Sequence, residues 1–312
     1  MHFCCISGLC QWCSPSSNVN VDSSAHLLTS LIRKRLTKKR VLPLVNNCNA
    51  LRQINNELWC CQDDGQILVL DPDMTQKHTL HNRLWGDVHD VIELNDDEVV
   101  LAGSGGLFLL SAAGQVKATM QQGLTYLRCM VIDGAVYVHC LSENAMLLLK
   151  FTFNGDAWLF HVIMNMQTLG SVQLLQHSST IDYPDNHCWL CTRQRADVTM
   201  AASSSEMFLC IAASATAITV SSTGEITRKI DVQGDLLSEG MAYPRISAAD
   251  SQGNILLLDD YMGVLQVRDV TGEFHQLKMD CGALMLDDAL FSNGALYLVC
   301  DDGRSLWLYT AN

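Results

Sequence analysis

The stretch Asn254-Ile-Leu-Leu-Leu-Asp259-Asp260-Tyr-Met-Gly263 decides the fold, because an apolar run leads into a turn rich in Asp and Gly and the same unit recurs along the chain. Similar apolar runs begin at residues 57, 98, 135 and 295, so neighbouring copies are 41, 37 and 41 residues apart. Repeats of about 40 to 45 residues that carry several strands are typical of β-propeller blades, which are small twisted four-stranded sheets. The sequence therefore predicts an all-β propeller.

The turn after this strand recurs as Asp63-Asp64-Gly65 and Asp301-Asp302-Gly303. Gly accepts a positive φ and Asp hydrogen-bonds its own backbone, so we interpret these acidic pairs as hairpin turns. The sequence contains no Asp-x-Asp-x-Asp-Gly loop of the kind that binds calcium.

The number of blades depends on residues 137–254, which are too many for one blade. Two candidate strands, His187-Cys-Trp-Leu-Cys191 and Met207-Phe-Leu-Cys-Ile211, begin 20 residues apart there. We interpret the region as one irregular blade with an insertion, which gives six blades; seven blades, one of them degenerate, are the alternative. The last blade lacks an outer strand, and Arg40-Val-Leu-Pro-Leu-Val-Asn46 is expected to supply it and close the ring.

The composition of the chain excludes some classes of function. The chain has 312 residues, of which 48% are hydrophobic and 17% charged, so it has ample material for a core. No run approaches the ~18 uncharged apolar residues of a membrane-spanning helix. Residues 1–48 carry six basic residues and one acid, and the remaining 264 carry 14 basic and 32 acidic residues. An acidic body argues against broad binding to nucleic-acid backbones, although it leaves room for a local basic patch.

Residues 243–274 carry a family resemblance. They resemble the NHL repeat at these positions: Pro244, Ala248, Asp250, Gly253, Asn254, Asp259, Gln266, Val267 and Gly272. The chain is thus similar to the six-bladed NHL propeller that ends many tripartite-motif proteins. The resemblance implies a propeller that recruits protein substrates or binds RNA. No RING finger, B-box or coiled coil is recognisable, so ligase activity is not carried over.

Residues 1–39 are predicted to be a Cys-rich and basic leader, and residues 40–312 the propeller. The leader is expected to be helical over 22–38, with its leucines near one face. Cys4 and Cys5 beside the basic run could be S-acylated, which would attach the protein to a membrane. The same run could be a nuclear import signal. A zinc site built on Cys10-x-x-Cys13 is disfavoured by the short loop.

The compartment is predicted from the cysteines and the amino-terminal sequence. Seven of the 14 cysteines sit inside apolar strand-like runs, as free thiols do, and no secretory signal is evident. We therefore expect a reducing cytoplasmic setting, with membrane association or nuclear import through the leader left open.

The inner strand of each blade is expected about ten residues before the apolar run. Five residues there are candidates for a binding site at one end of the central channel: Arg52, His89, Arg128, Arg245 and Asp287. Our hypothesis is that the cationic members form a ring that grips a carboxylate or phosphate of a partner. The alternative is that they pair with inner acids such as Asp90 and Asp288.

These observations favour a monomeric, non-catalytic platform that binds a protein or peptide at one channel face, with no cofactor. A metal-dependent hydrolase resembling lactonases is the alternative, and its ligands would come from this set: Asp90, Glu93, Asp133, Asp182 and Asp288. RNA binding on a local basic patch is the second alternative. No Gly-x-Ser-x-Gly elbow is present.

Overall fold

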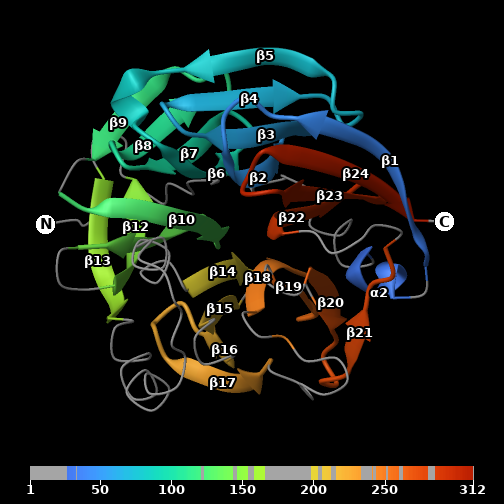
Figure 1. The fold of residues 1–312 in the computed structure, drawn as a ribbon. Coiled ribbons are helices and arrows are strands. Elements are labelled where there is room, and N and C mark those ends of the chain that lie inside the picture. The colour runs from blue at the N-terminus through green and yellow to red at the C-terminus, as the bar shows by residue number, and fades with distance from the viewer. Residues whose placement is uncertain are drawn as a thin grey trace, which may run out of the picture.

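The computed structural model describes residues 27–32, 34–120, 123–142, 146–153, 158–165, 198–202, 206–211, 216–232, 241, 244–250, 252–259, 263–279 and 285–311. Its strands form six sheets of four strands each, arranged as blades around a common centre (Figure 1). The all-β prediction and the count of six blades are confirmed, and the alternative of seven is wrong.

The first three blades follow one another along the chain in simple antiparallel order. Blade 1 contains β2 (Cys48–Ile54), β3 (Glu57–Gln62), β4 (Gln66–Leu70) and β5 (Gln76–His81). A 3-10 turn, η1 (Arg83–Trp85), leads to blade 2, with β6 (Val88–Asn95), β7 (Glu98–Gly103), β8 (Gly106–Ser111) and β9 (Val116–Met120). Blade 3 contains β10 (Thr125–Ile132), β11 (Ala135–Leu141), β12 (Met146–Phe153) and β13 (Trp158–Asn165).

Blade 4 is the irregular blade of the sequence analysis. It contains β14 (Val198–Ala202), β15 (Met207–Ile211), β16 (Thr216–Val220) and β17 (Ile226–Asp231). Of the two candidate strands, Met207–Ile211 is therefore its second strand, and residues 187–191 lie outside the described part of the chain. Blade 5 contains β18 (Pro244–Ala249), β19 (Ile255–Asp259), β20 (Val264–Arg268) and β21 (Phe274–Gln276).

Blade 6 joins the two ends of the propeller. It contains β22 (Leu286–Ser292), β23 (Ala295–Cys300) and β24 (Ser305–Ala311), and β1 (Leu36–Pro43) pairs antiparallel with β24 as its outer strand. The register runs from Leu36 opposite Ala311 to Pro43 opposite Ser305. The predicted closing strand is confirmed, and it begins four residues earlier than the sequence suggested.

The leader helix is shorter than predicted. Helix α2 covers Leu27–Leu31, and residues 22–26 lie outside the described range. The expectation of helix as far as residue 38 is wrong, because Leu36 is buried and already belongs to β1. Pairing with β24 satisfies a row of backbone groups at once and outweighs the helical periodicity of the leucines. None of the described helices is long and apolar enough to span a membrane.

The core is divided among the spaces between blades. Six clusters of buried apolar side chains each join two neighbouring blades, as sheets with two apolar faces require. Described cysteines are free and buried in these clusters: Cys48, Cys60, Cys61, Cys129, Cys140, Cys210 and Cys300. Cys188 and Cys191, also expected in apolar strands, lie outside the described residues.

The acidic pairs are hairpin turns, as predicted. Asp64 and Gly65 have φ of 58° and 70°, and Asp301 and Asp302 have φ of 60° and 58°. Asp tolerates this left-handed region better than most residues do, and Gly enters it without a steric penalty. These acids therefore shape the connections between strands.

Candidate functional site

The inner strands share an irregularity that controls what faces the channel. The pairing of inner with second strands skips one residue in five of the six described blades. The skipped residues are Asn49, His89, Leu127, Ser247 and Asp287. A bulge of this kind re-aims side chains and frees them from the regular alternation of a strand. The five bulges lie near the beginning of the inner strands and mark one end of the channel.

Two acids that directly follow a bulge connect neighbouring blades. Asp90 Oδ2 accepts a hydrogen bond of 3.0 Å from the Cys129 N–H of blade 3. Asp288 Oδ2 accepts one of 3.1 Å from the Leu51 N–H of blade 1. Both carboxylates are buried, so these bonds fix the inner strands against each other without access to water.

Arg52 neutralises both acids. Its Nε lies 2.9 Å from Asp90 Oδ1 and its Nη1 lies 2.9 Å from Asp288 Oδ2. Because Arg52 belongs to blade 1, this double ion pair ties blades 2, 1 and 6 together near the channel axis. Ser247 of blade 5 donates to Asp288 Oδ1 at 3.2 Å and adds a fourth blade to the network.

The network sets the charge states. Burial alone would raise the pKa of Asp288, but Arg52, Arg128 and the N–H groups of Leu51 and Ala289 hold the pKa below its usual value. For Arg52, burial opposes the positive charge, and Asp90 and Asp288 more than offset it and raise the pKa of the guanidinium. The channel is therefore crossed by a fixed set of ionised groups.

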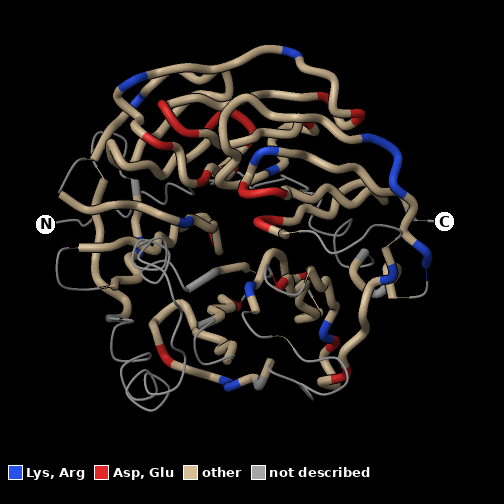
Figure 2. The backbone as a smooth tube through the Cα atoms, in the orientation of Figure 1, with Lys and Arg blue, Asp and Glu red and all other residues tan. Residues whose placement is uncertain are grey.

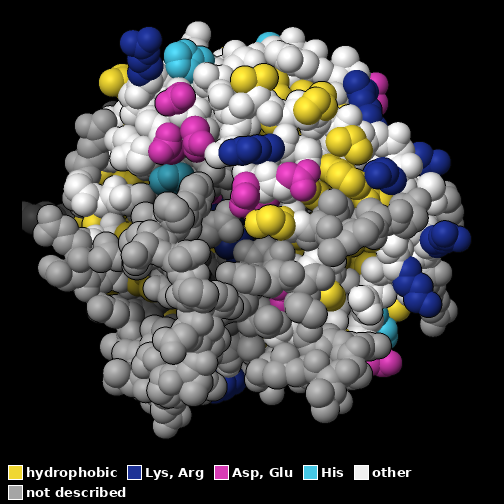
Figure 3. Space-filling model, in the orientation of Figure 1, with side chains coloured by type: hydrophobic (Ala, Val, Ile, Leu, Met, Phe, Trp, Pro, Cys, Tyr) yellow, Lys and Arg dark blue, Asp and Glu magenta, His cyan; other side chains and the backbone are white. Residues whose placement is uncertain are grey.

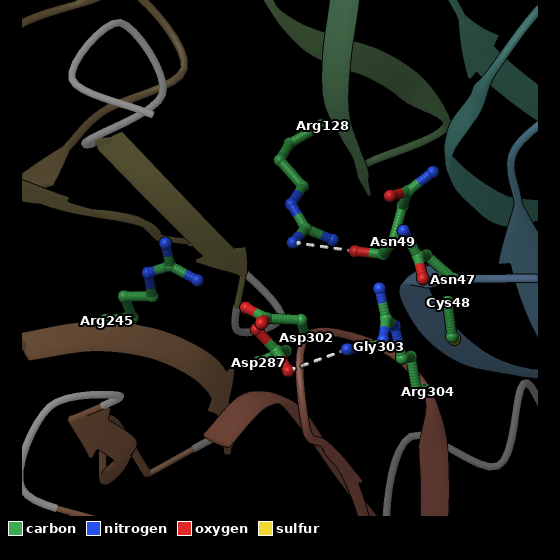
Figure 4. Close-up of a pocket in the computed structure, with 9 residues that line it drawn as sticks. All are labelled: Asn47, Cys48, Asn49, Arg128, Arg245, Asp287, Asp302, Gly303 and Arg304. Atoms are coloured by element: carbon green, nitrogen blue, oxygen red, sulfur yellow. Dashed lines mark hydrogen bonds between the residues drawn. The ribbon is translucent and has the colours of Figure 1, made fainter. Parts of the chain in front are cut away.

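A polar pocket of about 230 Å³ opens at the bulged end of the channel. It is lined by Asn47, Cys48, Asn49, Arg128, Arg245, Asp287, Asp302, Gly303 and Arg304. Figure 4 shows Arg128 and Arg245 reaching into it from different sides, with Asp287 and Asp302 between them and Arg304 beside the β23–β24 turn. Four blades thus contribute to one pocket, which we call the channel-mouth pocket.

Hydrogen bonds fix part of this lining. Arg128 Nη2 donates to the Asn49 carbonyl oxygen at 3.3 Å, and Arg128 Nη1 lies 3.7 Å from Asp288 Oδ2. Within the described part of the chain, Nη1 has no hydrogen-bond partner. Asp287 Oδ2 accepts a bond of 2.9 Å from the Gly303 N–H. Arg128 is therefore held by the Asn49 carbonyl oxygen and lies near Asp288, and Asp287 holds the β23–β24 turn.

The structure brings together three of the five residues named from the sequence. Arg128, Arg245 and Asp287 line the channel-mouth pocket. Arg52 lies beside it in the ion-pair network, as the alternative interpretation of pairing with inner acids anticipated. His89 Nδ1 lies 2.7 Å from the Tyr126 carbonyl oxygen, so this nitrogen carries the proton and donates. The Cys4 and Cys5 lipidation sites lie outside the described residues.

Sequence reasoning missed the loop residues of the pocket. Asn47 comes from the β1–β2 connection, Asn49 is the bulged residue of β2, and Asp302 and Arg304 come from the β23–β24 turn. The Asp-Asp-Gly pattern did predict the latter turn. The pattern could not show that the pairing of β1 with β24 places the β1–β2 connection beside the β23–β24 turn.

The pocket has few groups suited to catalysis. Its one thiol is Cys48, and a hydrogen bond with Cys60 together with burial raises the pKa of Cys48 well above its usual value. A protonated thiol is a poor nucleophile. No histidine lines the pocket among the described residues. The remaining side chains of the lining are amides, carboxylates and guanidinium groups.

Of the carboxylates proposed as metal ligands, those that the structure describes do not form one metal-binding group. Asp90 and Asp288 are bonded to Arg52, whereas Glu93 lies further along β6 and Asp133 lies in the β10–β11 turn. Asp182 lies outside the described part of the chain.

A different group has metal-ligand composition. Within the described ranges, one set of side chains brings its ligand atoms within 4.8 Å of one another: Asp269, Glu273 and His275. They belong to the outer β20–β21 turn, where Asp269 Oδ2 lies 3.0 Å from His275 Nε2. Asp269 Oδ1 also accepts bonds from Thr271 and Glu273, so the group is explained as a hydrogen-bonded turn.

Comparison with known proteins supports the propeller fold but no protein family. No model of a known protein family matches the chain, and no curated protein matches it. The NHL resemblance is therefore not supported by either comparison. Its signature residues have local roles: Asp250 accepts the Asn254 N–H at 3.0 Å, and Gly253 has a φ of 86°.

Solved propellers of several kinds are similar in structure. A calcium-binding protein, regucalcin, from Agrobacterium tumefaciens has a TM-score of 0.57 at 12% identity over 88% of this chain and 95% of its own. Virginiamycin B lyase from Staphylococcus aureus gives 0.52 at 10% over 88% and 99%. The β-propeller domain of Cps50 (Swd1) from Myceliophteria thermophila gives 0.54 at 10% over 88% and 85%. At such low identity these likenesses show the propeller fold alone.

Proposed function

We propose that this protein is a non-catalytic binding module whose channel-mouth pocket holds an acidic segment of a partner protein. The observation that carries the proposal is the convergence of Arg128, Arg245 and Arg304 on one polar pocket. Guanidinium groups bind carboxylates through paired hydrogen bonds, and their planar shape makes such contacts specific.

The size of the pocket fits one or two side chains. Its volume of about 230 Å³ is below the roughly 300 to 1,000 Å³ of sites that enclose drug-sized ligands. An Asp or Glu side chain, or a terminal carboxylate, fills such a space while the rest of the peptide lies over the blade face.

The nearby acids support binding over metal-dependent hydrolysis. Asp288 is saturated by Arg52 and backbone N–H groups, and Asp287 holds the Gly303 N–H. A metal ion would have to displace these partners, which a buried and preformed network resists.

Selection from a library of random peptides tests the proposal. We expect the selected peptides to be enriched in Asp and Glu. The double substitution Arg128→Met/Arg245→Met should lower the affinity for a selected peptide at least about tenfold. The reason is that each charged hydrogen bond contributes roughly 1.5 to 3 kcal/mol. A control variant, Lys77→Met with Lys117→Met, makes the same charge change on outer strands and should bind normally.

Two results would reject the proposal. One is a set of selected peptides with no acidic enrichment, or with the same affinity for the Arg128→Met/Arg245→Met variant. The other is stoichiometric binding of calcium or zinc that raises the melting temperature, if the Asp90→Asn variant shows neither the binding nor the rise. That result would favour the hydrolase alternative.

A further inference from the structure

A band of exposed cations follows the outer rim of blade 6. Its members are Lys34, Arg35, Lys38, Lys39, Arg40 and Lys278, and we call this band the blade-6 rim. Figure 2 shows the basic positions along β1 and beside α2, and Figure 3 shows Lys and Arg side chains gathered at the same edge of the molecule. The rim is remote from the channel-mouth pocket and independent of the proposed function.

The fold holds these cations on a firm frame. Leu28 and Leu31 of α2 are buried against blades 5 and 6, and the Leu36 N–H donates to the Lys278 carbonyl oxygen at 3.3 Å. A bulge in the pairing of β1 with β24 falls at Lys39. As a result Lys38, Lys39 and Arg40 are all exposed, whereas a regular strand would turn alternate side chains inward.

Part of the positive charge of the rim has an acidic residue beside it, because Arg40 Nη1 donates to the Asp73 carbonyl oxygen at 2.6 Å. Lys34, Arg35 and Lys39 differ. The sequence has no Asp or Glu between Asp22 and Glu57, and β24 carries no charged residue. Among the described residues, no carboxylate pairs with Lys34, Arg35 or Lys39. The outer strands β5 and β9 differ, because Lys77 lies 2.5 Å from Glu57 and Lys117 lies 2.8 Å from Glu98. The rim is thus a local positive field on a chain with a net charge of −13.

A groove in the rim combines charge with aliphatic surface. It has a volume of about 510 Å³ and is lined by Ile32, Lys34, Arg35, Gln276, Lys278 and Met279. Val41, further along β1, is 43% exposed. Cations beside exposed aliphatic side chains match the phosphate and acyl boundary of a lipid bilayer. We propose that the blade-6 rim docks the propeller onto a membrane rich in anionic lipids.

Two other anionic or acidic partners fit the rim less well. An import receptor reads a free extended peptide, but Leu36–Arg40 is hydrogen-bonded into β1 and its release would open the propeller. Single-stranded RNA is held by exposed aromatic side chains as well as charge. Among the described residues, the aromatic ring that a rim cation covers is that of Trp307, which is half-buried and lies 4.1 Å from Lys38 Nζ, measured to the ring centre.

Vesicle flotation tests the docking surface. The full chain is produced in bacteria, so that S-acylation of the leader does not contribute, and mixed with vesicles of phosphatidylcholine alone or with phosphatidylserine. We expect binding to the anionic vesicles that weakens with added salt. Each cation near such a surface contributes about a factor of five, so Lys34→Gln with Arg35→Gln and Lys39→Gln should weaken partition on the order of 100-fold.

A matched variant and a competitor complete the design. Lys77→Gln with Lys117→Gln and Lys229→Gln removes the same charge from other outer strands and should bind vesicles nearly as the unchanged protein does. All six side chains are exposed, so the rim variant should melt at the temperature of the unchanged protein, and the matched variant should melt only slightly lower, because it also breaks the exposed Lys77 and Lys117 ion pairs. Equal binding to neutral vesicles, retention of binding by the rim variant, or an equal loss in the matched variant would overturn the proposal. Single-stranded RNA is added as the competitor. If it releases the protein from the vesicles at a concentration below that of the lipid, the rim is assigned to RNA instead.

Discussion

The double ion pair of Arg52 can be tested by replacing it with methionine, which keeps most of the volume and removes the charge. The variant leaves Asp90 without Arg52 and leaves Asp288 with Arg128 alone, at 3.7 Å, and the two acidic side chains are 1% and 6% exposed. Breaking a buried pair in this way costs roughly 3 to 5 kcal/mol, and the 20% exposure of Arg52 favours the lower figure. For 312 residues at about 2.1 cal/mol/K each, 3 kcal/mol lowers Tm by about 5 °C.

The pH dependence gives this prediction its sharpest test. In the unchanged protein, the lowered pKa of Asp288 contributes stability above the unfolded pKa, and this contribution is lost as pH falls through the folded pKa. In the Arg52→Met variant Asp288 loses one of the two cations that hold its pKa down, so it takes up a proton at a higher pH than in the unchanged protein. The stability gap between the two proteins should therefore be widest at neutral pH, and it should narrow as pH falls and go on narrowing below about 4, towards the lowered pKa of Asp288 in the unchanged protein.

Calorimetric melting at several pH values is the assay, with Lys77→Met as a control that breaks an exposed pair. The control should cost at most about 1 kcal/mol. Adding Asp90→Asn and Asp288→Asn to Arg52→Met should recover part of the loss, because the neutral amides need no cation. A loss no larger than that of the control, or a gap that does not change with pH, would refute the role given to Arg52.

Three further predictions concern single positions. His139 is fully buried with neither ring nitrogen hydrogen-bonded among the described residues, and burial, then Arg128, lowers its pKa to about 4. Stability should therefore fall as pH drops from about 6.5 towards 4, where the unfolded chain alone takes up a proton, and His139→Leu should remove roughly 2 to 3 kcal/mol of that fall. Gly303→Ala places a Cβ 2.8 Å from the Cys48 backbone nitrogen and oxygen, so it should lower Tm more than Gly294→Ala, which meets nothing within 4 Å. Leu31→Ala should cost about 2 to 4 kcal/mol by urea unfolding if α2 is part of the core, and unchanged stability would contradict that placement.

Much of the fold could be predicted from local pattern. The second strands alternate or run apolar and end at Asp-Gly turns, so Glu57–Gln62, Glu98–Gly103 and Ala295–Cys300 were found almost to the residue. Residues 22–38 were harder, because leucine spacing alone favoured a helix. The partner that converts Leu36–Pro43 into a strand is β24, far away in sequence and invisible to a local pattern.

The site was predicted less well than the fold for a reason that lies in the bulges. Counting back about ten residues from each second strand assumes regular strands, yet His89 and Asp287 are themselves skipped in the pairing. Arg128 follows a skipped residue, Arg245 precedes one by two positions, and Arg52 follows one by three. One extra residue reverses the facing of a strand, so residues at similar counts reach the pocket, the ion-pair network or a neighbouring backbone.

Hydrogen–deuterium exchange with and without a selected acidic peptide tests the central claim most directly. If the channel-mouth pocket is the binding site, the amides of residues 44–49 and 301–304 should exchange more slowly when the peptide is bound, and the protection should vanish in the Arg128→Met/Arg245→Met variant. Protection confined to outer strands, with unchanged exchange in these two connections, would contradict the account.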